Sequence, residues 1–424
     1  MGALRSWLFA AAAVGAAACG ATLGRSSPAP RPTRLLDGGR ALRVALFTTP
    51  KPIVIGGTGE WRLYDSGGDA TLARGAAGES WEIRRDGGRM RAVRSDGIPT
   101  AARPGPFVAR PMDAAALLTV NGHPYRGEIT LVPTDSGVLV INRLPVESYL
   151  RGVVPLEIGK RQPAEHAAVE AQAVAARSYA YAHLKDDPRA LFDLTGGVLD
   201  QVYNGAEAES PTTDAAVTGT RGLVLRFAGK VISAPYSSSC GGMTAAATEV
   251  WQGASDFPYL TAVSDKIPGS SRYYCDEAPR FNWTRTLERS DLNSALQKYL
   301  KAYVAVPLNG AGTVRSVDIE GRTPTGRVRA ILVVTDHGQY TLRGNEMRFV
   351  LRSAGGEILN STYFSVVAER DVDGYLRRLR IDGKGYGHGI GMCQWGAIGR
   401  ARAGQDFRTI LQTYYQGTSI DAID

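Results

Sequence analysis

Glu157 is the residue whose type and setting first suggest acid–base chemistry. It stands in the stretch RGVVPLEIGK, close in sequence to Val153, Val154, Leu156 and Ile158. Apolar surroundings disfavour the charged form of a carboxyl group, so they raise its pKa toward the range in which it can donate a proton near neutral pH. The structural alternative is a glutamate that pairs with an arginine or faces the positive end of the following helix. On the local sequence alone, charge pairing is the more frequent explanation.

A second carboxyl group, Glu147, lies a few residues earlier in LPVESYL. Its place on an amphipathic turn favours a surface position or an ion pair. Other catalytic motifs are missing, because the chain has no nucleophile-elbow serine, no HExxH and only five histidines. It therefore lacks the residues of a serine hydrolase or a zinc protease.

The stretch IDGKGYGHGIGMCQWGA places glycine at every second position from Gly383 to Gly391. If this segment is extended, the five glycines share one face, and Tyr386 and His388 share the other. Such a run indicates a sharp bend, a bulge, or a ligand or second backbone that passes close by, and a glycine-rich core strand is the alternative. Nucleotide binding is disfavoured because the Lys-Ser/Thr ending of a P-loop is missing. The flanking glycines leave His388 accessible, so we expect it to belong to a site.

Four cysteines, Cys19, Cys240, Cys275 and Cys393, bear on the compartment and on metal binding. An exported protein meets an oxidising environment, so we expect a Cys240–Cys275 disulfide, with Cys393 unpaired and buried. Two alternatives remain, namely free thiols and a zinc site made by the three later cysteines and His388. No CxxC or HxxxH spacing supports the metal site.

Residues 1–18 form a predicted signal peptide. Arg5 precedes an apolar run that is too short to span a bilayer, and small residues stand directly before Cys19. Those residues resemble a bacterial lipobox, although Ala16 stands where leucine is usual, so we expect a lipid on Cys19, with plain secretion as the alternative. Residues 19–40 then form a flexible, proline-containing tether. The expected location is the cell envelope, as a membrane-anchored lipoprotein.

The net charge of +8 gives little support for nucleic-acid binding. The basic residues are scattered, and no Lys/Arg cluster interleaved with aromatic residues forms a stripe. For an exported protein, a weak attraction to the carboxylates of the cell wall is the more economical explanation. We therefore expect no nucleic-acid partner.

The sequence patterns of the helices and strands that must position these residues predict an α+β fold. Short alternating runs between turn-forming residues indicate a β-rich N-terminal part over 41–142. Many alanines, and no glycine or proline after the first turn, predict a long buried helix over 163–184. The core, 143–424, would pack antiparallel strands around this helix, with an inserted subdomain near 287–365. A helical hairpin split around Gly404 closes the chain.

Several motifs occur together in one order from about Leu42 to the C-terminus. They are VESYLRGVVPLEIG, AVEAQAVAARSYAYAHL, QVYNG, SSSCGGMTAAATEVW and GYGHGIGMCQWGAIGRA. This series resembles the SpoIID/LytB family, the stage II sporulation protein D domain of bacterial cell-wall proteins. The family includes lytic transglycosylases that cut the glycan strands of peptidoglycan, and modifiers that enhance a partner amidase. Its catalytic glutamate, in the motif VP-x-E, matches Glu157.

The resemblance implies a lytic transglycosylase in which Glu157 acts first as an acid and then as a base. The residue would protonate the glycosidic oxygen between N-acetylmuramic acid and N-acetylglucosamine. Its carboxylate would then take the proton of the muramyl 6-hydroxyl as a 1,6-anhydro ring closes. One carboxylate is enough because the substrate supplies its own nucleophile, whereas ordinary glycosidases need two. The alternative is a non-catalytic glycan-binding protein that enhances an N-acetylmuramoyl-L-alanine amidase.

Motif position also implies which residues line a glycan-binding groove. These predicted substrate-binding residues are Tyr125, Arg126, Gln172, Arg177, Tyr203, Tyr386, His388 and Gln394. Two departures from the family pattern argue against a metal: Ser237 stands where a histidine is frequent in HS-x-x-GG, and Cys393 replaces the serine common in GMSQ. We therefore expect glycan strands, an amidase and a membrane as partners, and no cofactor.

Overall fold

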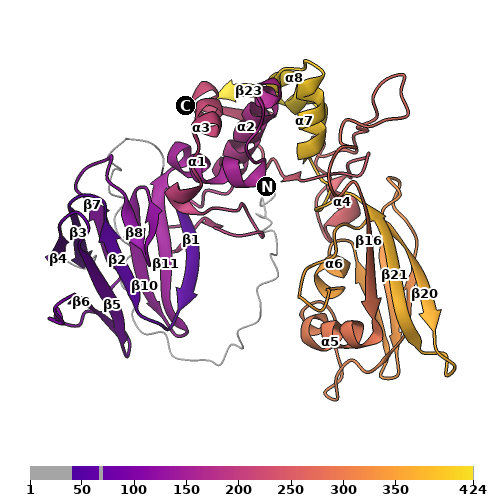
Figure 1. Cartoon of the computed structure of the whole chain (residues 1–424), viewed down its shortest axis with the longest axis horizontal. Coiled ribbons are helices and arrows are strands. Elements are labelled where there is room, and N and C mark those ends of the chain that lie inside the picture. The colour runs from indigo at the N-terminus through magenta and orange to yellow at the C-terminus, as the bar shows by residue number, and fades with distance from the viewer. Residues whose placement is uncertain (1–40, 66–69, 424) are drawn as a thin grey trace, which may run out of the picture. The chain divides into compact units, whose positions relative to one another are not determined.

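The computed structural model describes residues 41–65 and 70–423, and the chain divides into two compact units (Figure 1). The N-terminal unit contains the described residues up to 162, Gln172–Ser233 and the last residues from Ile420. The C-terminal unit contains Pro163–Ala171 and Ala234–Ser419. The predicted signal peptide, the tether and the lipid-bearing Cys19 lie outside the described residues.

The N-terminal unit is built on two sheets, as the alternating runs over 41–142 predict. The larger sheet has the order β12 (Leu194–Thr195), β1 (Ala41–Thr49), β11 (Gly137–Pro145), β10 (Glu128–Thr134), β7 (Phe107–Pro111), β3 (Trp61–Asp65), β4 (Ala70–Gly75). The smaller sheet has the order β6 (Arg89–Arg94), β5 (Ser80–Asp86), β2 (Ile53–Gly57), β8 (Leu118–Val120), β9 (His123–Tyr125). Neighbouring strands are antiparallel except β1 and β12, which are parallel.

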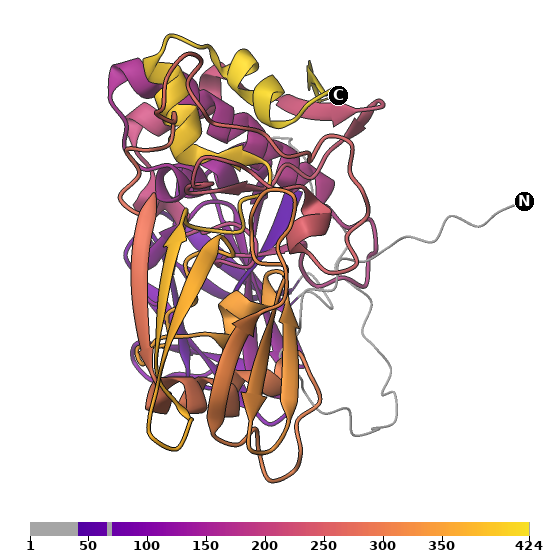
Figure 2. The ribbon, with the colours of Figure 1, turned by 90° about the vertical axis from the view of Figure 1, so that its right-hand side faces the viewer.

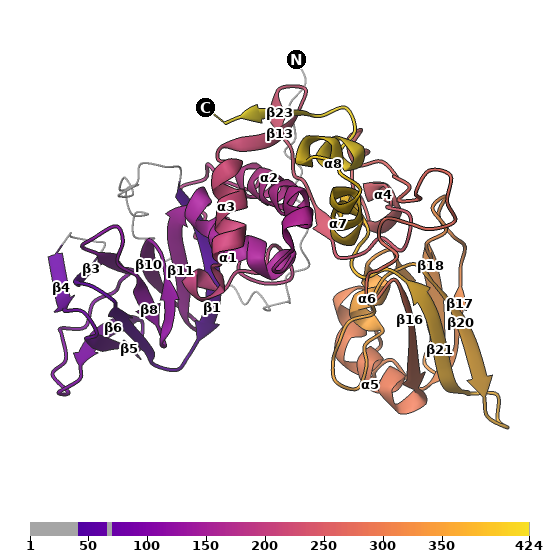
Figure 3. The same ribbon diagram turned by 45° about the horizontal axis from the view of Figure 1, so that its top comes forward.

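Three helices lie beside β1 and β11 (Figure 3), and the division between the two units falls within one of them, α2. They are α1 (Val146–Glu157), α2 (His166–Ala182) and α3 (Pro211–Gly219). The predicted long helix is confirmed as α2 with a preceding 3₁₀ turn, Pro163–Glu165, and the small side chains from Ala171 to Ala176 are buried, as the alanine content indicates. A third small sheet joins β14 (Lys230–Val231), β13 (Leu223–Phe227) and β23 (Ser419–Ala422).

The C-terminal unit has a parallel strand pair, β15 (Tyr236–Ser237) with β22 (Met392–Cys393), and a short helix, α4 (Ala247–Val250). The predicted helical hairpin is confirmed as α7 (Gln394–Arg402) and α8 (Phe407–Tyr414), which flank Gly404. The mixture of separate sheets and helices in both units confirms the α+β class.

Residues 282–384, here called the inserted module, form two antiparallel sheets of three strands each (Figure 2). The first has the order β16 (Asn282–Glu288), β21 (Leu376–Lys384), β20 (Phe364–Arg370), and the second has the order β17 (Val314–Ile319), β18 (Ala330–Thr335), β19 (Gln339–Arg343). Two helices, α5 (Arg289–Tyr299) and α6 (Glu346–Val350), and a 3₁₀ turn, Leu300–Ala302, complete it. Buried apolar side chains from all these strands, mostly leucine, isoleucine and valine, form a core of its own.

The prediction that the glycine-rich stretch is one extended strand is wrong beyond Lys384. Strand β21 ends there, and the next four alternate glycines all have positive φ, which L side chains rarely adopt. A Cβ at Gly385 would lie 2.6 Å from the backbone oxygen of Ser239, and one at Gly389 would lie 2.3 Å from the guanidinium of Arg327. The stretch is therefore bent backbone in close contact with other protein segments, which agrees with one of the alternatives derived from the sequence.

Candidate functional site

Glu157 is the last residue of α1. The buried face of α1 carries Val146, Tyr149, Leu150, Val153 and Val154, whose spacing of three and four residues fits one side of a helix. The helix stops because Gly159 has φ +77°, the left-handed conformation of a helix C-terminus. This ending leaves Glu157 partly exposed, beside the more exposed Leu156.

A loop from the QVYNG motif fixes the Glu157 carboxyl group. The backbone N–H of Val202 donates to Glu157 Oε1 over 2.8 Å. Its neighbour Tyr203 packs directly on α1, where a Cβ at Gly152 would lie only 2.6 Å from the tyrosine ring. The hydroxyl of Tyr203 donates to Asn142 Oδ1 on β11 over 2.7 Å. Gly152 and Asn142 thus position the loop that holds the carboxyl group.

Two tyrosines pack with Tyr203. Its ring centroid lies 4.9 Å from that of Tyr149 and 6.2 Å from that of Tyr125. Burial raises the pKa of both Tyr149 and Tyr203 well above the usual range. Tyr125 and Tyr203 are buried, so both support the loop from inside, and burial argues against direct contact of either ring with a glycan.

Two predicted groove arginines are bound to carboxylates of the same unit. Arg177 has no exposed surface and donates to both oxygens of Glu147, at 2.8 and 2.9 Å. Arg126 makes the same two-pronged contact with Glu209, at 2.5 and 2.6 Å. The expected pairing role of Glu147 is confirmed, and burial argues against direct glycan contact by Arg177.

The remaining predicted groove residues are distributed over both units. Gln172, on α2 in the N-terminal unit, is fully buried. Gln394, the first residue of α7 in the C-terminal unit, is also buried. Tyr386 is partly buried and has the guanidinium of Arg280 4.2 Å from its ring centroid.

His388 is held as a neutral, hydrogen-bonded ring in the C-terminal unit. Its Nδ1 accepts a hydrogen bond from the N–H of Ile390 over 3.0 Å, and its ring lies 5.4 Å from that of Trp251. Burial, followed by the nearby charges of Arg348 and Arg327, lowers the pKa of His388 to about 3. These contacts favour a structural role. The residue is partly exposed, and its expected membership of a site stays a prediction.

The cysteines form a cluster rather than a bonded pair. The structure describes Cys240, Cys275 and Cys393 as free, buried thiols, and the sulfurs of Cys240 and Cys275 are 3.6 Å apart. The fourth member is Asp265, which the sequence analysis did not select, and His388 is not part of the group. No motif spacing connects Asp265 to the cysteines, so only the fold could identify it.

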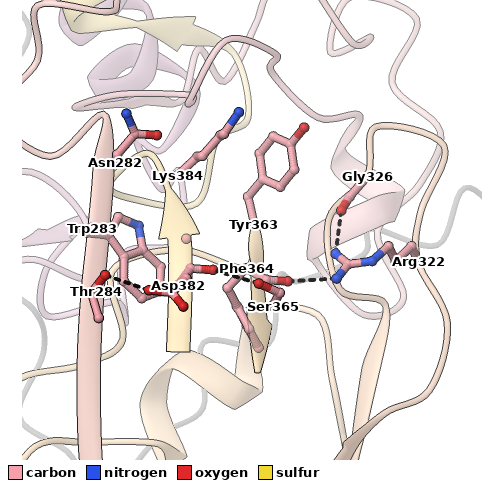
Figure 4. Close-up of a pocket in the computed structure, with 11 residues that line it drawn as sticks. Asn282, Trp283, Thr284, Arg322, Gly326, Tyr363, Phe364, Ser365, Asp382 and Lys384 are labelled. Atoms are coloured by element: carbon pink, nitrogen blue, oxygen red, sulfur yellow. Dashed lines mark hydrogen bonds between the residues drawn. The ribbon is translucent and has the colours of Figure 1, made fainter. Parts of the chain in front are cut away.

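The inserted module carries an open groove of about 720 Å³ across β16, β20 and β21 (Figure 4). Trp283, Tyr363 and Lys384 contribute side chains to it. The guanidinium of Arg322 donates to two backbone oxygens, those of Gly326 and Phe364. None of the residues that line this groove was predicted from the sequence as a site residue.

Comparisons with known proteins identify the family. Residues 134–227 match the family model of the stage II sporulation protein, SpoIID. An uncharacterized protein of Brachyspira hyodysenteriae is 34% identical over 303 residues, which cover 71% of this chain and 73% of that protein. The chain belongs to the SpoIID/LytB family.

Two further family members carry names that indicate a role. The amidase enhancer of Bacillus subtilis is 32% identical over 311 residues, which cover 64% of this chain but only 40% of the enhancer. The stage II sporulation protein D of the same organism is 28% identical over 300 residues, covering 67% of this chain and 76% of that protein. The coarse expectation, a SpoIID/LytB protein related to amidase enhancers and sporulation proteins, is thereby confirmed.

The matched segments divide the predicted site residues. Glu157 and the loop that holds it lie within the SpoIID match. Residues 269–391 match a second model, a domain of unknown function (DUF8618), which includes the inserted module and both Tyr386 and His388. Among the residues described, no helix of this SpoIID/LytB protein combines the length and apolar character needed to cross a membrane.

Proposed function

We propose that this protein cleaves the glycan strands of peptidoglycan as a lytic transglycosylase, with Glu157 as its acid and base. The observation that carries the proposal is the carboxyl group at the end of α1, partly exposed and oriented by the N–H of Val202. A general acid must be held within hydrogen-bond reach of the atom that it protonates, and a carboxyl group that is fixed and partly exposed supports this role.

The surroundings of Glu157 suit a group that gains and loses one proton. The C-terminal end of a helix is negative and disfavours a carboxylate, and α1 has no basic residue in its last turn to offset this effect. The N–H of Val202 stabilises the carboxylate form instead. The end of the helix and the N–H of Val202 thus act in opposite directions on the carboxylate.

In the proposed reaction, Glu157 donates its proton to the oxygen of the glycosidic bond, which breaks at the muramyl C1. The muramyl 6-hydroxyl attacks the same carbon and passes its proton to the Glu157 carboxylate. The products are a glycan ending in a 4-hydroxyl and a 1,6-anhydromuramyl end, and the acid is restored. No water enters the products, so they are lighter by one water than the products of hydrolysis.

A hydrolase would need a second carboxylate. The candidate is Asp200, which stands two residues before Val202 in the loop that holds Glu157. Both of its oxygens already accept hydrogen bonds, Oδ1 from Tyr179 and Oδ2 from Thr195. These contacts hold Asp200 in the loop, so the proposal gives it a positioning role and uses Glu157 as its one reacting carboxylate.

Apolar side chains near Glu157 in the sequence are exposed and suit contact with sugar rings. Leu156 is 41% exposed, and Val198 and Leu199, in the loop that leads to Val202, are 83% and 67% exposed. Val198 and Leu199 are also neighbours in the sequence. In the proposed complex, these residues contact the apolar faces of the glycan beside the scissile bond.

The test is incubation of the purified protein with peptide-bearing and peptide-stripped glycan strands, followed by mass analysis. We expect 1,6-anhydromuramyl ends, and we expect Glu157→Gln to lower their rate of formation by roughly 10²–10⁴-fold because the amide cannot transfer the proton. Glu60→Gln, an exposed glutamate of the same unit, is the matched control. Hydrated reducing ends would overturn the mechanism and make Asp200→Asn the next variant.

A second candidate function is enhancement of an N-acetylmuramoyl-L-alanine amidase. The observation that favours it is the 32% identity to an amidase enhancer. Adding an amidase to the purified protein and peptide-bearing glycan strands tests this function. Faster release of stem peptides by the amidase, with no glycan cleavage by the protein alone, would assign the enhancer role.

For location, we propose export to the cell envelope with a lipid on Cys19. Labelling of cells with a fatty-acid analogue should mark the wild-type protein and not the Cys19→Ala variant. If the variant keeps both its label and its membrane fraction, the lipoprotein proposal is wrong and secretion replaces it.

A further inference from the structure

Four side chains of metal-binding type meet in the core of the C-terminal unit. They are Cys240, Asp265, Cys275 and Cys393, and one ligand atom from each lies within 4.8 Å of those of the others. All four residues have 0% exposed surface. The cluster belongs to neither the Glu157 site nor the groove of the inserted module.

The distances match a tetrahedral zinc site better than a disulfide. Zn–S bonds of about 2.3 Å at tetrahedral angles place two sulfurs about 3.8 Å apart, and a Zn–O bond of about 2.0 Å places the oxygen about 3.5 Å from each sulfur. The sulfurs of Cys240 and Cys275 are 3.6 Å apart, and the sulfur of Cys240 is 3.3 Å from Asp265 Oδ2. A disulfide requires about 2.05 Å.

Backbone and side-chain donors surround the cluster as they do in metal sites. The sulfur of Cys393 accepts hydrogen bonds from the N–H groups of Cys240, at 3.2 Å, and Gly396, at 3.3 Å, and it lies at the N-terminus of α7, whose dipole favours a thiolate. Asp265 Oδ1 accepts from the hydroxyl of Tyr414 at 2.6 Å and from Arg400 at 3.1 Å. Such outer contacts orient metal ligands.

Two buried arginines near the cluster also require negatively charged partners. Arg327 is 1% exposed and donates to the backbone oxygens of Cys240 and Met243, and it forms no ion pair with a carboxylate in the described part of the chain. Arg400 adds a second buried guanidinium next to Asp265. Three thiolates, one carboxylate and Zn²⁺ carry a net charge of −2, which these two cations neutralise. Without the metal, a buried excess of positive charge would be costly.

We propose that Cys240, Asp265, Cys275 and Cys393 bind one Zn²⁺ in a closed, structural site. Three thiolates select zinc over the hard cations that prefer oxygen ligands. Complete burial leaves no open coordination position for a substrate, which separates this site from a catalytic one. The ligand set differs from the alternative considered in the sequence analysis, because Asp265 takes the place of His388.

The decisive measurement is elemental analysis of the exported full-length protein after exhaustive dialysis, together with non-reducing peptide mapping. We expect one zinc per chain, and Cys240, Cys275 and Cys393 all open to alkylation after the metal is chelated under denaturing conditions. A Cys240–Cys275 disulfide without stoichiometric metal would overturn the proposal. A different metal at one per chain would overturn the choice of zinc.

Two variants and one control assign the ligands. Asp265→Asn should lose stoichiometric zinc, and Tyr414→Phe, which keeps the ring and removes only the hydrogen bond, should weaken zinc affinity about 10–100-fold in competition with a chromophoric chelator. If Asp265→Asn does not fold, the Tyr414→Phe titration still tests the site. His388→Gln should keep both stoichiometry and affinity. Zinc loss in His388→Gln with unchanged binding in Tyr414→Phe would refute this ligand set.

Discussion

The Arg177→Leu variant tests whether Arg177 stabilises the core or binds glycan. The Arg177 side chain is fully buried, makes two charge-assisted hydrogen bonds to Glu147, and also donates to Thr220 and to the backbone oxygens of Val217 and Leu223. Removal of one partner of a buried ion pair costs about 3–5 kcal/mol. The Glu147 side chain is 20% exposed, so water relieves part of its lost pairing. We therefore expect Arg177→Leu to destabilise the protein by about 3 kcal/mol, at the low end of that range.

Thermal and urea unfolding followed by circular dichroism measure this change. A loss of about 3 kcal/mol corresponds to a fall in melting temperature of roughly 6–12 °C for a unit of 150–250 residues. The matched control is Arg189→Leu, because Arg189 is 89% exposed and pairs with Asp187 at the surface; we expect a change within about 0.5 kcal/mol. The reasoning is refuted if Arg177→Leu melts within about 2 °C of the wild type while glycan affinity falls.

Two further predictions concern the C-terminal unit. His388 has a pKa lowered to about 3, below its unfolded value of about 6.5, so its neutral form stabilises the fold above pH 6.5 and this stability is lost as the pH falls toward 3. In urea titrations, the free energy of unfolding of the wild type should fall by about 2 kcal/mol more than that of His388→Gln between pH 7 and pH 5. Equal falls would contradict the assignment of a lowered pKa to His388. In Gly396→Ala, the new Cβ would lie 2.1 Å from both Asp265 Oδ2 and the hydroxyl of Tyr414. We expect a destabilisation of about 2–3 kcal/mol, whereas Gly88→Ala, which meets nothing within 4 Å, should be neutral in the same titration.

The regular elements were predictable because their signals are local. The alanine-rich helix needs only propensity and the absence of breakers to be recognised, and the β-rich N-terminal part needs only alternation and turn residues. The glycine-rich stretch was predicted incorrectly beyond Lys384. Alternation of residue types cannot reveal a left-handed backbone, since φ is set there by segments such as Ser239 and Arg327 that lie far away in the sequence.

The site was predictable only where a motif carried it. Glu157 was selected from an apolar stretch and a family motif, both visible in the sequence. The partners of Arg126 and Arg177 were not predictable, because Glu209 and Glu147 reach them through tertiary packing. Asp265 was missed for a similar reason, since its separations from Cys240 and Cys275 match no known metal-ligand spacing and Cys393 reaches it only through the fold.

The inserted module begins and ends at one point of the fold. Asn282 and Lys384 are paired residues of neighbouring antiparallel strands, and the N–H of Gly385 donates to the carbonyl of Phe281 just outside them. The module also has a hydrophobic core that draws only on its own residues. A two-residue turn is the shortest link between paired strand ends, so such a turn in place of the residues between Asn282 and Lys384 would rejoin the chain without displacing either flank. The module is thus an exchangeable cassette, provided that its replacement supplies the contact of Arg327, which donates to the backbone oxygens of Cys240 and Met243 outside the module.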